Sequence, residues 1–300
     1  MANFFVTGIY MIFTLNLFSN IKVKLLKNQF CLLMMVLLFS NELSARIYPT
    51  PTPVSKYLKK INSKVINSRV NRVDCIYVVN LDRRPEKWKR MQRLFKEAGI
   101  NGNRFSAIDG LKISDEIQTE LAGNYPVRML RGEVGCLLSH VSVMKDAYDR
   151  GFDLIWVFED DVEFIEDPHV MTPIIKALSS IDPNWDVLYT DMDSKHSSGE
   201  IALALGLDFR PDRLFYYPLE HYLRRKFVSA DLMRLGQRYG LYSYLVSRKG
   251  MKKIYHYFTH VNLWTAVDID IHYIPTIREY STTREVVTLW THSPISDTRN

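Results

Sequence analysis

Three consecutive acidic residues, Glu159, Asp160 and Asp161, follow an apolar run in the segment IWVFEDDVEF. Side chains alternate along a strand, so Glu159 and Asp161 are expected on one side and Asp160 on the other. Two carboxylates on one side repel each other and favour a bound cation, and Mg²⁺ or Mn²⁺ prefers such oxygen ligands. A single acid at a strand end commonly caps a turn, but three in a row favour a functional site.

Two arginines stand at the start of a predicted strand–helix turn, in the segment VNLDRRPEKW. A guanidinium group and the positive end of a helix both suit an anionic ligand such as a diphosphate, so Arg83 and Arg84 are candidate anion-binding residues. Solvated loop arginines are the simpler interpretation. Neither of the glycine-rich phosphate loops, GxGxxG and GxxxxGKS/T, occurs in the sequence, so a nucleotide must be held in another way.

Two further segments carry residues that could take part in chemistry. RGEVGCLLSH combines a glycine-punctuated helix start with Ser139 and His140, although a histidine on such a helix is more often a packing residue than a ligand. VDIDIHYIP, from Val267, alternates acidic and apolar residues, so we expect Asp268 and Asp270 on one face of a strand, where they could supply a general base. An exposed strand with one polar side explains the same alternation.

The elements that must position these residues alternate between strand and helix. Apolar runs predict strands at 75–80, 104–109 and 154–158, and further strands that start at Asp186 and Tyr242. Helical spacing predicts helices over 85–99 and 132–151, and a third after Ser247. This alternation predicts an α/β domain with a mainly parallel sheet. Such sheets bind ligands at the carboxyl ends of their strands, so the 80–84 loop, Asp109 and the three acids should meet at one crevice.

Composition indicates a foldable globular chain, with 47% hydrophobic and 24% charged residues among 300 and a net charge of +6. Much of this positive charge lies between Arg46 and Arg72, where seven basic residues and no acidic residue occur. The prolines at its start predict an extended linker over 46–72. Its charge suits either a solvated surface or anionic lipid headgroups.

Two apolar runs precede this linker. FCLLMMVLLF, from Phe30, follows three lysines and has the character of a secretory signal, but it is short for a transmembrane helix. A second run spans Phe4 to Phe18. Residues 1–45 are therefore interpreted as an apolar leader, either a signal peptide or a membrane anchor, with a misplaced start as the remaining alternative. The folded domain is expected over 73–300.

The cysteines Cys31, Cys75 and Cys136 show no Cys-x-x-Cys spacing. Neither a structural zinc site nor a disulfide framework is therefore expected. Cys75 and Cys136 are interpreted as buried small apolar residues.

Two other function classes could use acids at a strand end. A phosphate-receiving signalling domain binds magnesium in this way, and Asp191, Asp193 and Lys253 could be its later residues. In such a domain the acid pair should end the first strand, whereas a substantial α/β region precedes Glu159 here. A non-catalytic carbohydrate- or partner-binding domain with a degenerate site is the other alternative.

Taken together, the motifs resemble glycosyltransferase family 25, which includes lipooligosaccharide and procollagen galactosyltransferases. The resemblance runs from about Cys75 to Asp270. It rests on these segments in order: IYVVNLDRRPEKWKRM, RFSAIDG, GEVGCLLSHVSVMKDA, IWVFEDDVEF, YSYLVSRKGMKKI and VDID. It implies a single GT-A type, Rossmann-like glycosyltransferase domain that uses a nucleotide-sugar donor and usually a divalent metal, Mn²⁺ or Mg²⁺.

The resemblance also implies roles for individual residues. Glu159, Asp160 and Asp161 match the acidic motif where metal and donor diphosphate meet, with Glu159 and Asp161 as the metal ligands. Asp268 and Asp270 are the candidates for acceptor contact or base catalysis. The residues expected to bind the donor are Asn80, Arg83, Arg84, Asp109, Ser139, His140 and Asp160.

The expected function is transfer of a hexose, with galactose as the first choice, from a donor such as UDP-galactose. The acceptor would be a hydroxyl of a glycan, lipooligosaccharide or protein, and inversion is the stereochemistry that the resemblance implies. Residues 195–238 follow the family less clearly, so acceptor specificity is expected there. No nucleic-acid partner is expected. The leader implies an exported or membrane-associated protein, and lipopolysaccharide biosynthesis is the expected process.

Overall fold

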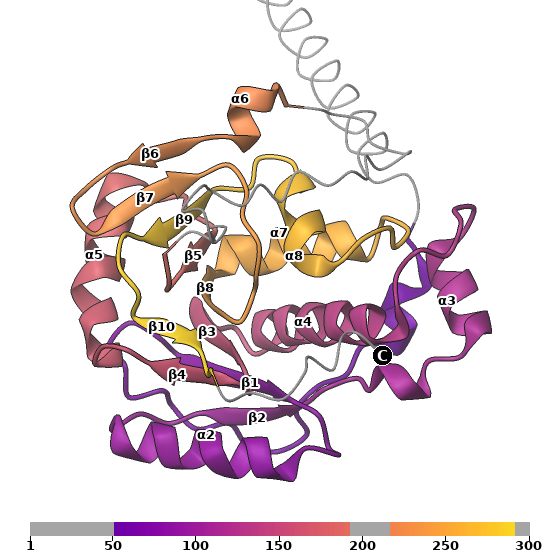
Figure 1. Ribbon diagram of the computed structural model, residues 1–300, viewed down its shortest axis with the longest axis horizontal. Coiled ribbons are helices and arrows are strands. Elements are labelled where there is room, and N and C mark those ends of the chain that lie inside the picture. Colours follow the sequence, from indigo (N-terminus) through magenta and orange to yellow (C-terminus); the bar gives the residue numbers. More distant parts are fainter. Residues whose placement is uncertain (1–50, 193–216, 292–300) are drawn as a thin grey trace, which may run out of the picture. The chain divides into compact units, whose positions relative to one another are not determined.

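The computed structural model describes residues 51–192 and 217–291. Within these ranges the central element is an eight-stranded sheet with the order β2-β1-β3-β8-β5-β9-β7-β6 (Figure 1). Its strands are β1 (Cys75–Asn80), β2 (Asn103–Ser106), β3 (Leu154–Glu159), β5 (Val187–Tyr189), β6 (Arg225–Phe227), β7 (Leu232–Leu235), β8 (Ser243–Ser247) and β9 (Glu279–Thr282). A second sheet pairs β4 (Val162–Phe164) with β10 (Val287–Leu289).

Helices cover the sheet and connect its strands. The α-helices are α2 (Pro85–Glu97), α3 (Asp115–Ala122), α4 (Arg131–Asp149), α5 (Met171–Ile181), α6 (Leu219–Tyr222), α7 (Arg248–Phe258) and α8 (Val267–Asp270). Short 3₁₀ helices are η1 (Pro53–Tyr57), η2 (Gly110–Lys112), η3 (Pro168–Val170) and η4 (Ile271–Tyr273).

Most strands of the large sheet point in the same direction. β1 pairs in parallel with β2 and β3, and β5 with β9, while β8 lies antiparallel between β3 and β5. β7 is antiparallel to both β9 and β6. Only β7 and β8 among the described strands of this sheet therefore run against the others, which confirms the expected α/β fold with a mainly parallel sheet.

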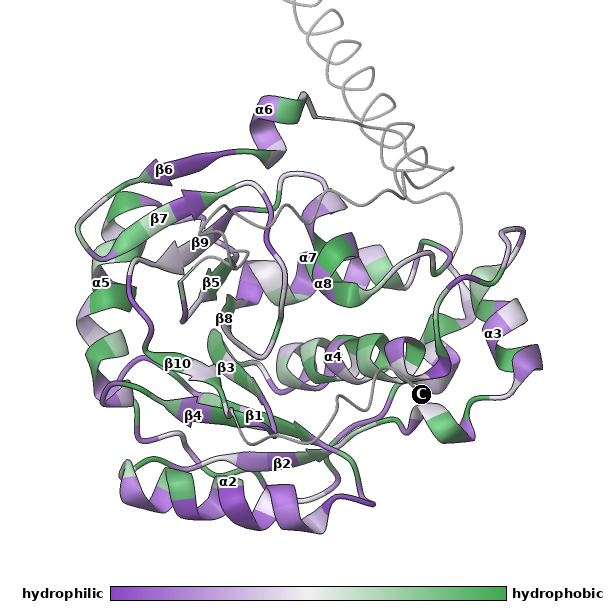
Figure 2. Ribbon diagram, viewed as in Figure 1, coloured by the Kyte–Doolittle hydropathy of each residue, from purple (hydrophilic) through white to green (hydrophobic). Residues whose placement is uncertain are grey.

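Alternation along the strands distributes side chains to two covered faces of the sheet. Ile76 and Trp156 belong to a buried apolar cluster with side chains of α2 and α5. Tyr77 points to the opposite face, where its hydroxyl donates to the Asp146 carboxylate of α4 at 2.8 Å. Because both faces are covered, β1 is buried along its whole length, and β1 and β3 are largely hydrophobic in Figure 2.

The helices that flank the site begin and end as their sequences predict. Pro85 occupies the first position of α2, and Gly99 follows the helix at a φ of +67°, a conformation that favours glycine. At the start of α4, the Glu133 carboxylate accepts a hydrogen bond from the Leu130 backbone N–H at 2.8 Å. The predicted helices over 85–99 and 132–151 are confirmed to within two residues.

Two predicted strands differ from the structure. The strand expected over 104–109 ends at Ser106, because η2 begins at Gly110 after the Asp109 cap. The strand expected from Val267 is wrong, since 267–270 form helix α8 and 271–273 form η4. Acids in the first turn of a helix are stabilised by its dipole, so the same VDID pattern suits a helix start.

The described part of the expected linker, residues 51–72, packs against α4. Val54 is fully buried, the Lys59 backbone N–H donates to Ser142 Oγ at 3.0 Å, and the Ile61 N–H donates to Asp146 Oδ1 at 3.1 Å. This differs from the extended linker that the prolines predict. The expected leader, 1–45, lies outside the described residues. Among the residues described, no helix is both long and apolar enough to span a membrane.

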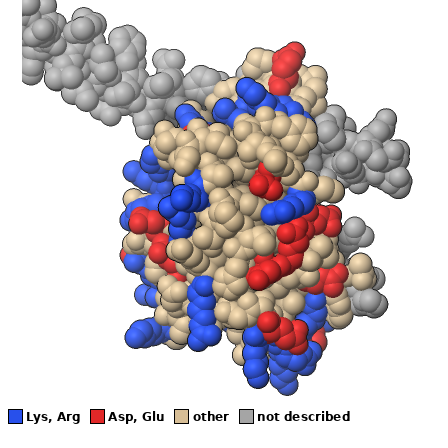
Figure 3. Space-filling view, turned by 90° about the vertical axis from the view of Figure 1, so that its left-hand side faces the viewer, with Lys and Arg blue, Asp and Glu red and all other residues tan. Residues whose placement is uncertain are grey.

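Charge on the face drawn in Figure 3 is mixed. Basic and acidic side chains form separate small clusters there, divided by uncharged surface. A protein that binds the phosphate backbone of a nucleic acid usually presents a continuous basic face. The view in Figure 3 shows no such continuous basic surface over the described residues on that face.

Candidate active site

The ends of three parallel strands bring the predicted site residues to one edge of the sheet. Val79 of β1 is in register with Glu159 of β3, and Asn80 with Ser106 of β2. β8 runs the other way, so the segment that enters it lies at the same edge, with Ser243 opposite Phe158. The expected meeting of the 80–84 loop, the segment after β2 and the acids is thus confirmed.

Close backbone contact fixes helix α4 beside this edge. A Cβ atom on Gly135 would lie 2.6 Å from the Ile108 carbonyl oxygen, so only glycine allows this approach. One turn later, the Ser139 hydroxyl donates to the Gly135 carbonyl at 2.6 Å and accepts from the Ile108 N–H at 2.8 Å. Ser139 therefore connects α4 to the segment after β2, in the wall of a cavity.

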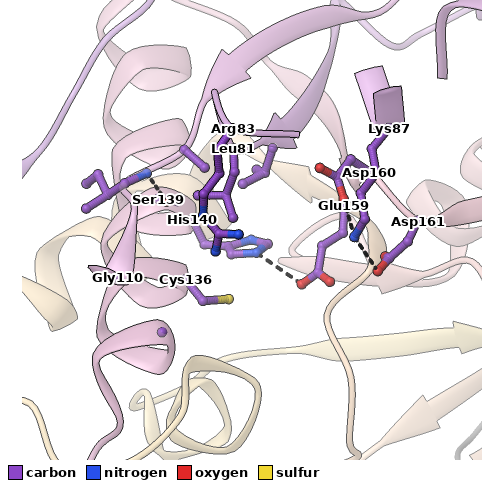
Figure 4. Close-up of a pocket in the computed structure, with 14 residues that line it drawn as sticks. Leu81, Arg83, Lys87, Gly110, Cys136, Ser139, His140, Glu159, Asp160 and Asp161 are labelled. Atoms are coloured by element: carbon purple, nitrogen blue, oxygen red, sulfur yellow. Dashed lines mark hydrogen bonds and ion pairs between the residues drawn. The ribbon is translucent and has the colours of Figure 1, made fainter. Parts of the chain in front are cut away.

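This first cavity lies between the strand ends and α4 (Figure 4). Backbone and apolar groups from the ends of β1 and β2 and from α4 form part of its wall. The charged and polar side chains that line it are Arg83, Lys87, Ser139, His140, Glu159, Asp160 and Asp161.

The three acids all line the first cavity, but only Glu159 and Asp161 also line a second one. Glu159 ends β3 and lines the first cavity together with Asp161, which lies in the turn before β4. Asp160 is buried and accepts a hydrogen bond from Asn80 Nδ2 at 2.6 Å. Burial raises the pKa of the Asp160 carboxyl to about 6, although Lys87 and Asn80 both act to lower it.

Lys87 is a site residue that the sequence analysis missed. Its side chain is 6% exposed, and its ammonium group lies 3.1 Å from Asp160 Oδ1 and 3.3 Å from Asp161 Oδ2 (Figure 4). Burial alone lowers the pKa of Lys87, but the two carboxylates outweigh it and raise the pKa overall, so the group is charged. The available signal was the spacing of four residues to Met91, which places both on the buried face of α2.

Access to the cavity differs among the predicted donor-binding residues Asn80, Arg83, Arg84 and Asp109. Arg83 lines it, and its Nε lies 3.2 Å from Asp109 Oδ2, so Asp109 orients Arg83. Asn80 is 1% exposed. Its Nδ2 donates to the Asp160 carboxylate and, at 3.0 Å, to the Arg84 carbonyl oxygen. The expectation that Asn80 faces a nucleotide is therefore replaced by a role in positioning Asp160.

His140 lies between α4 and the sheet. It is 1% exposed, and its Nδ1 is 2.6 Å from the hydroxyl of Tyr244 on β8. Its Nε2 lies 3.4 Å from Glu159 Oε1. Cys136, one turn earlier on α4, is partly buried and also lines the cavity, which differs from the buried small apolar residue expected. Burial and nearby carboxylates raise the pKa of this thiol well above its ordinary value, so it is protonated at neutral pH. Cys75 is buried, as expected.

A second cavity adjoins the first. It is lined by Glu133 on α4, by the segment 240–242 before β8, by residues 266–269 around α8, and by Leu289 and Trp290. Cys136, Glu159 and Asp161 line both cavities. The three side chains are therefore a shared wall between two spaces.

Asp268 and Asp270 do not share a face. Residues two apart on a helix point in nearly opposite directions, so Asp268 lines the second cavity while Asp270 is fully buried. Asp268 Oδ2 accepts from the Gly240 N–H at 3.0 Å, and Asp270 Oδ1 accepts from the Tyr257 hydroxyl at 3.1 Å. Of the two predicted bases, Asp268 is the one placed at a cavity.

The donor atoms present fit a hard divalent cation. Glu159 and Asp161 are partly exposed carboxylates that both belong to the shared wall. Mg²⁺ and Mn²⁺ favour carboxylate oxygens and keep open positions for water or phosphate. The competing signalling arrangement is not assembled: Asp191 pairs with Arg238, Lys253 pairs with Asp186, and Asp193 lies outside the described residues.

A family model described as glycosyltransferase family 25 (LPS biosynthesis protein) matches residues 73–271. The chain therefore belongs to glycosyltransferase family 25. It is 30% identical over 148 residues to a glycosyltransferase 25 family member from Drosophila melanogaster, covering 46% of this chain and 24% of the relative.

Two human relatives carry different functional names. Procollagen galactosyltransferase 2 is 33% identical over 128 residues, which cover 39% of this chain and 20% of the relative. Inactive glycosyltransferase 25 family member 3 is 29% identical over 142 residues, which cover 43% and 24% respectively. The matched regions thus span about a quarter of the length of these relatives.

Among solved structures, A197 from STIV aligns with 74% of this chain and 86% of its own, at a TM-score of 0.36 and 11% identity.

Proposed function

We propose that this chain is a glycosyltransferase that moves a hexose, with galactose the first to be tested, from a nucleotide sugar to an acceptor hydroxyl. The observation that carries the proposal is the pair of adjoining cavities with Cys136, Glu159 and Asp161 in their shared wall. Transfer between two substrates requires two neighbouring binding spaces with the reacting groups at their junction.

The first cavity suits the donor diphosphate. Arg83 lies in its wall and is held by Asp109, so its guanidinium is pre-oriented. Lys87 adds a buried positive charge directly behind Asp160 and Asp161. Two cations beside a cavity stabilise the negative charge that develops on a leaving nucleoside diphosphate.

Glu159 and Asp161 would hold Mn²⁺ or Mg²⁺. The ion would supply further positive charge to the leaving diphosphate. His140 orients Glu159 through its contact at 3.4 Å, and Lys87 orients Asp161 at 3.3 Å. Each carboxylate is therefore held by a neighbour that also lines the first cavity.

Asp268 is the proposed general base. It lies in the second cavity, and the hydrogen bond from Gly240 N–H to Oδ2 fixes the orientation of its carboxylate. From there it would accept the proton of an acceptor hydroxyl that attacks the anomeric carbon. Attack from the cavity opposite the leaving group would invert that centre.

The comparisons support the proposal through the family and through the name of procollagen galactosyltransferase 2. We propose a glycan, lipooligosaccharide or protein as acceptor. Membrane association or export through residues 1–45 is proposed from the sequence. A relative named inactive makes a non-catalytic sugar-binding domain the second candidate.

The test is release of a nucleoside diphosphate by the purified chain, across a panel of UDP-, GDP- and CMP-linked sugars, with and without Mn²⁺. We expect turnover with one donor and a loss of about 100- to 1,000-fold in Asp161→Asn, which removes one charge at the shared wall. Asp149→Asn, an exposed acid at the end of α4, is the matched control and should retain the wild-type rate.

Full metal-dependent turnover by Asp161→Asn would refute the assignment of the shared wall. Donor binding without turnover in a folded wild-type protein would favour the non-catalytic domain.

A further inference from the structure

Three side chains of different chemistry converge beside the shared wall. The Cys136 sulfur, one His140 nitrogen and one Glu159 oxygen all lie within 4.8 Å of one another. Figure 4 shows the three groups directed toward one another, with Cys136 and His140 on α4 and Glu159 at the end of β3. Because Cys136 and His140 are four residues apart on one helix, their side chains lie on the same face.

His140 is oriented for a ligand on its Nε2 atom. Its Nδ1 is bonded to the Tyr244 hydroxyl at 2.6 Å, which fixes the ring. Its Nε2 is buried and has no hydrogen-bond partner among the described residues, and Glu159 Oε1 stands 3.4 Å away. A histidine that binds a metal through one nitrogen is typically held through the other in this way.

The spacing is compatible with tetrahedral coordination. Zinc lies about 2.0–2.3 Å from its ligands, so neighbouring ligand atoms around it are about 3.3–3.8 Å apart. The His140–Glu159 separation of 3.4 Å already falls in that range. The Cys136 sulfur lies within 4.8 Å of both atoms, and the Cys136 and Glu159 side chains line a cavity, which leaves them space to rotate toward a common ion. A fourth position remains toward the cavity, since Glu159 is 34% exposed.

The donor set selects for a different cation from the one proposed at Glu159 and Asp161. Sulfur and imidazole nitrogen favour Zn²⁺ over Mg²⁺ or Mn²⁺, which prefer oxygen. We propose that Cys136, His140 and Glu159 form a Zn²⁺ site. When zinc is bound there, Glu159 is no longer available to bind Mn²⁺ or Mg²⁺ together with Asp161. Binding replaces the thiol proton by a sulfur–zinc bond and releases that proton to solvent.

The inhibitory consequence rests on the proposed function. If Glu159 serves the transferase metal, Zn²⁺ at this site competes for that carboxylate. Zinc should then inhibit transfer at concentrations where Mg²⁺ and Mn²⁺ support it.

The test of the site itself is spectroscopic and needs no activity. Titration of the full-length wild-type chain with Co²⁺ should give a thiolate-to-cobalt charge-transfer band that Zn²⁺ removes and Mg²⁺ does not. Cys136→Ala should abolish the band. Cys75→Ala and Cys31→Ala are the matched controls and should retain it. Circular dichroism of each variant checks that it is folded.

A graded variant tests the role of Tyr244. Tyr244→Phe removes the hydrogen bond to Nδ1 and should weaken Zn²⁺ binding, measured by competition with a chelating dye, about 10-fold. Cys136→Ala loses a ligand and should weaken it further.

Absence of the band in the wild type, or its persistence in Cys136→Ala, would overturn the proposed site. A band present in a chain that transfers no sugar would leave the zinc site standing and refute the transferase instead. Weaker zinc inhibition in Cys136→Ala, measured relative to the zinc-free rate of that variant, would confirm the competition for Glu159, and unchanged inhibition would overturn it.

Discussion

Two charged clusters of the molecule differ in what surrounds them. The cavity cluster, Lys87, Glu159, Asp160 and Asp161, borders open space. Apart from Tyr242, which is partly buried and also lines the second cavity, the closed cluster is enclosed by protein. Its members are Tyr189, Asp191, Arg238, Tyr242, His272 and Glu279.

The closed cluster links two buried ion pairs. Arg238 Nη1 donates to Asp191 Oδ1 at 3.0 Å, and His272 Nδ1 lies 2.8 Å from Glu279 Oε2. The other ring nitrogen of His272, Nε2, donates to the Arg238 carbonyl oxygen at 2.7 Å, which joins the pairs. Burial alone lowers the pKa of His272, but Glu279 outweighs it and raises the pKa overall.

The comparison distinguishes charged groups that stabilise the fold, in the closed cluster, from charged groups placed to meet a ligand, in the cavity cluster. In the closed cluster, the charged groups are matched to partners within the protein, and Arg238 lies two residues before the 240–242 segment that forms a wall of the second cavity. In the cavity cluster, Glu159 and Asp161 are directed at space that a ligand can enter. Buried polar groups carry a cost unless they are paired, so access to a cavity, rather than charge alone, marks the site.

The largest expected effect is a loss of stability when an ion pair of the closed cluster is removed. Arg238→Ala leaves the Asp191 carboxylate buried without its cation and should lower the free energy of unfolding by about 3–5 kcal/mol, measured by urea denaturation. Arg93→Ala, at an exposed position of α2, is the control and should change it by no more than about 0.5 kcal/mol. Equal effects of the two substitutions would remove the distinction between the clusters.

A smaller expected effect is a change in the free energy of unfolding with pH, caused by Asp160 of the cavity cluster. The pKa of Asp160 is about 6 in the folded protein against an ordinary 3.8, so between these values the folded state binds a proton that the unfolded state releases. This contribution to stability is therefore present below pH 3.8 and is lost as pH rises through about 6.

Asp160→Asn removes this titration. Its stability relative to the wild type should rise by up to about 3 kcal/mol between about pH 4 and pH 7, since each pKa unit corresponds to about 1.4 kcal/mol. The measurement is urea denaturation of both proteins across that range. A difference that stays constant with pH would show that burial does not control Asp160.

The smallest effect concerns one hydrogen bond of the closed cluster. Tyr189→Phe removes the donor to Glu279 Oε1 at 2.7 Å and should cost about 1.5 kcal/mol of stability, because the acceptor is charged. Tyr255→Phe, a partly exposed tyrosine on α7, is the control and should be neutral. A loss confined to sugar transfer, with stability unchanged, would contradict the structural role.

The fold and the position of the site were predictable because they follow from local pattern. Apolar runs and helical spacing identified β1, β3, α2 and α4, and parallel strands necessarily end at one edge. The strand predicted for the VDID segment was wrong because its alternation suits both a strand and the first turn of a helix. Only packing decides between the two.

The finer geometry of the site depends on contacts that sequence spacing does not encode. Lys87 meets Asp160 across more than seventy positions, and Asn80 points to Asp160 instead of the cavity. Cys136 and His140 were visible as a helical pair, yet their convergence with Glu159 depends on how closely Gly135 allows α4 to approach the sheet edge.

The shared wall also makes the two cavities thermodynamically dependent on each other. A ligand that reorients Glu159 or Asp161 from one side changes the free energy of binding on the other side, because the same atoms line both. Linkage requires this effect to be reciprocal, so the factor by which a first ligand alters affinity for a second equals the factor in the reverse order. Neither cavity therefore has a binding constant that is independent of what occupies its neighbour.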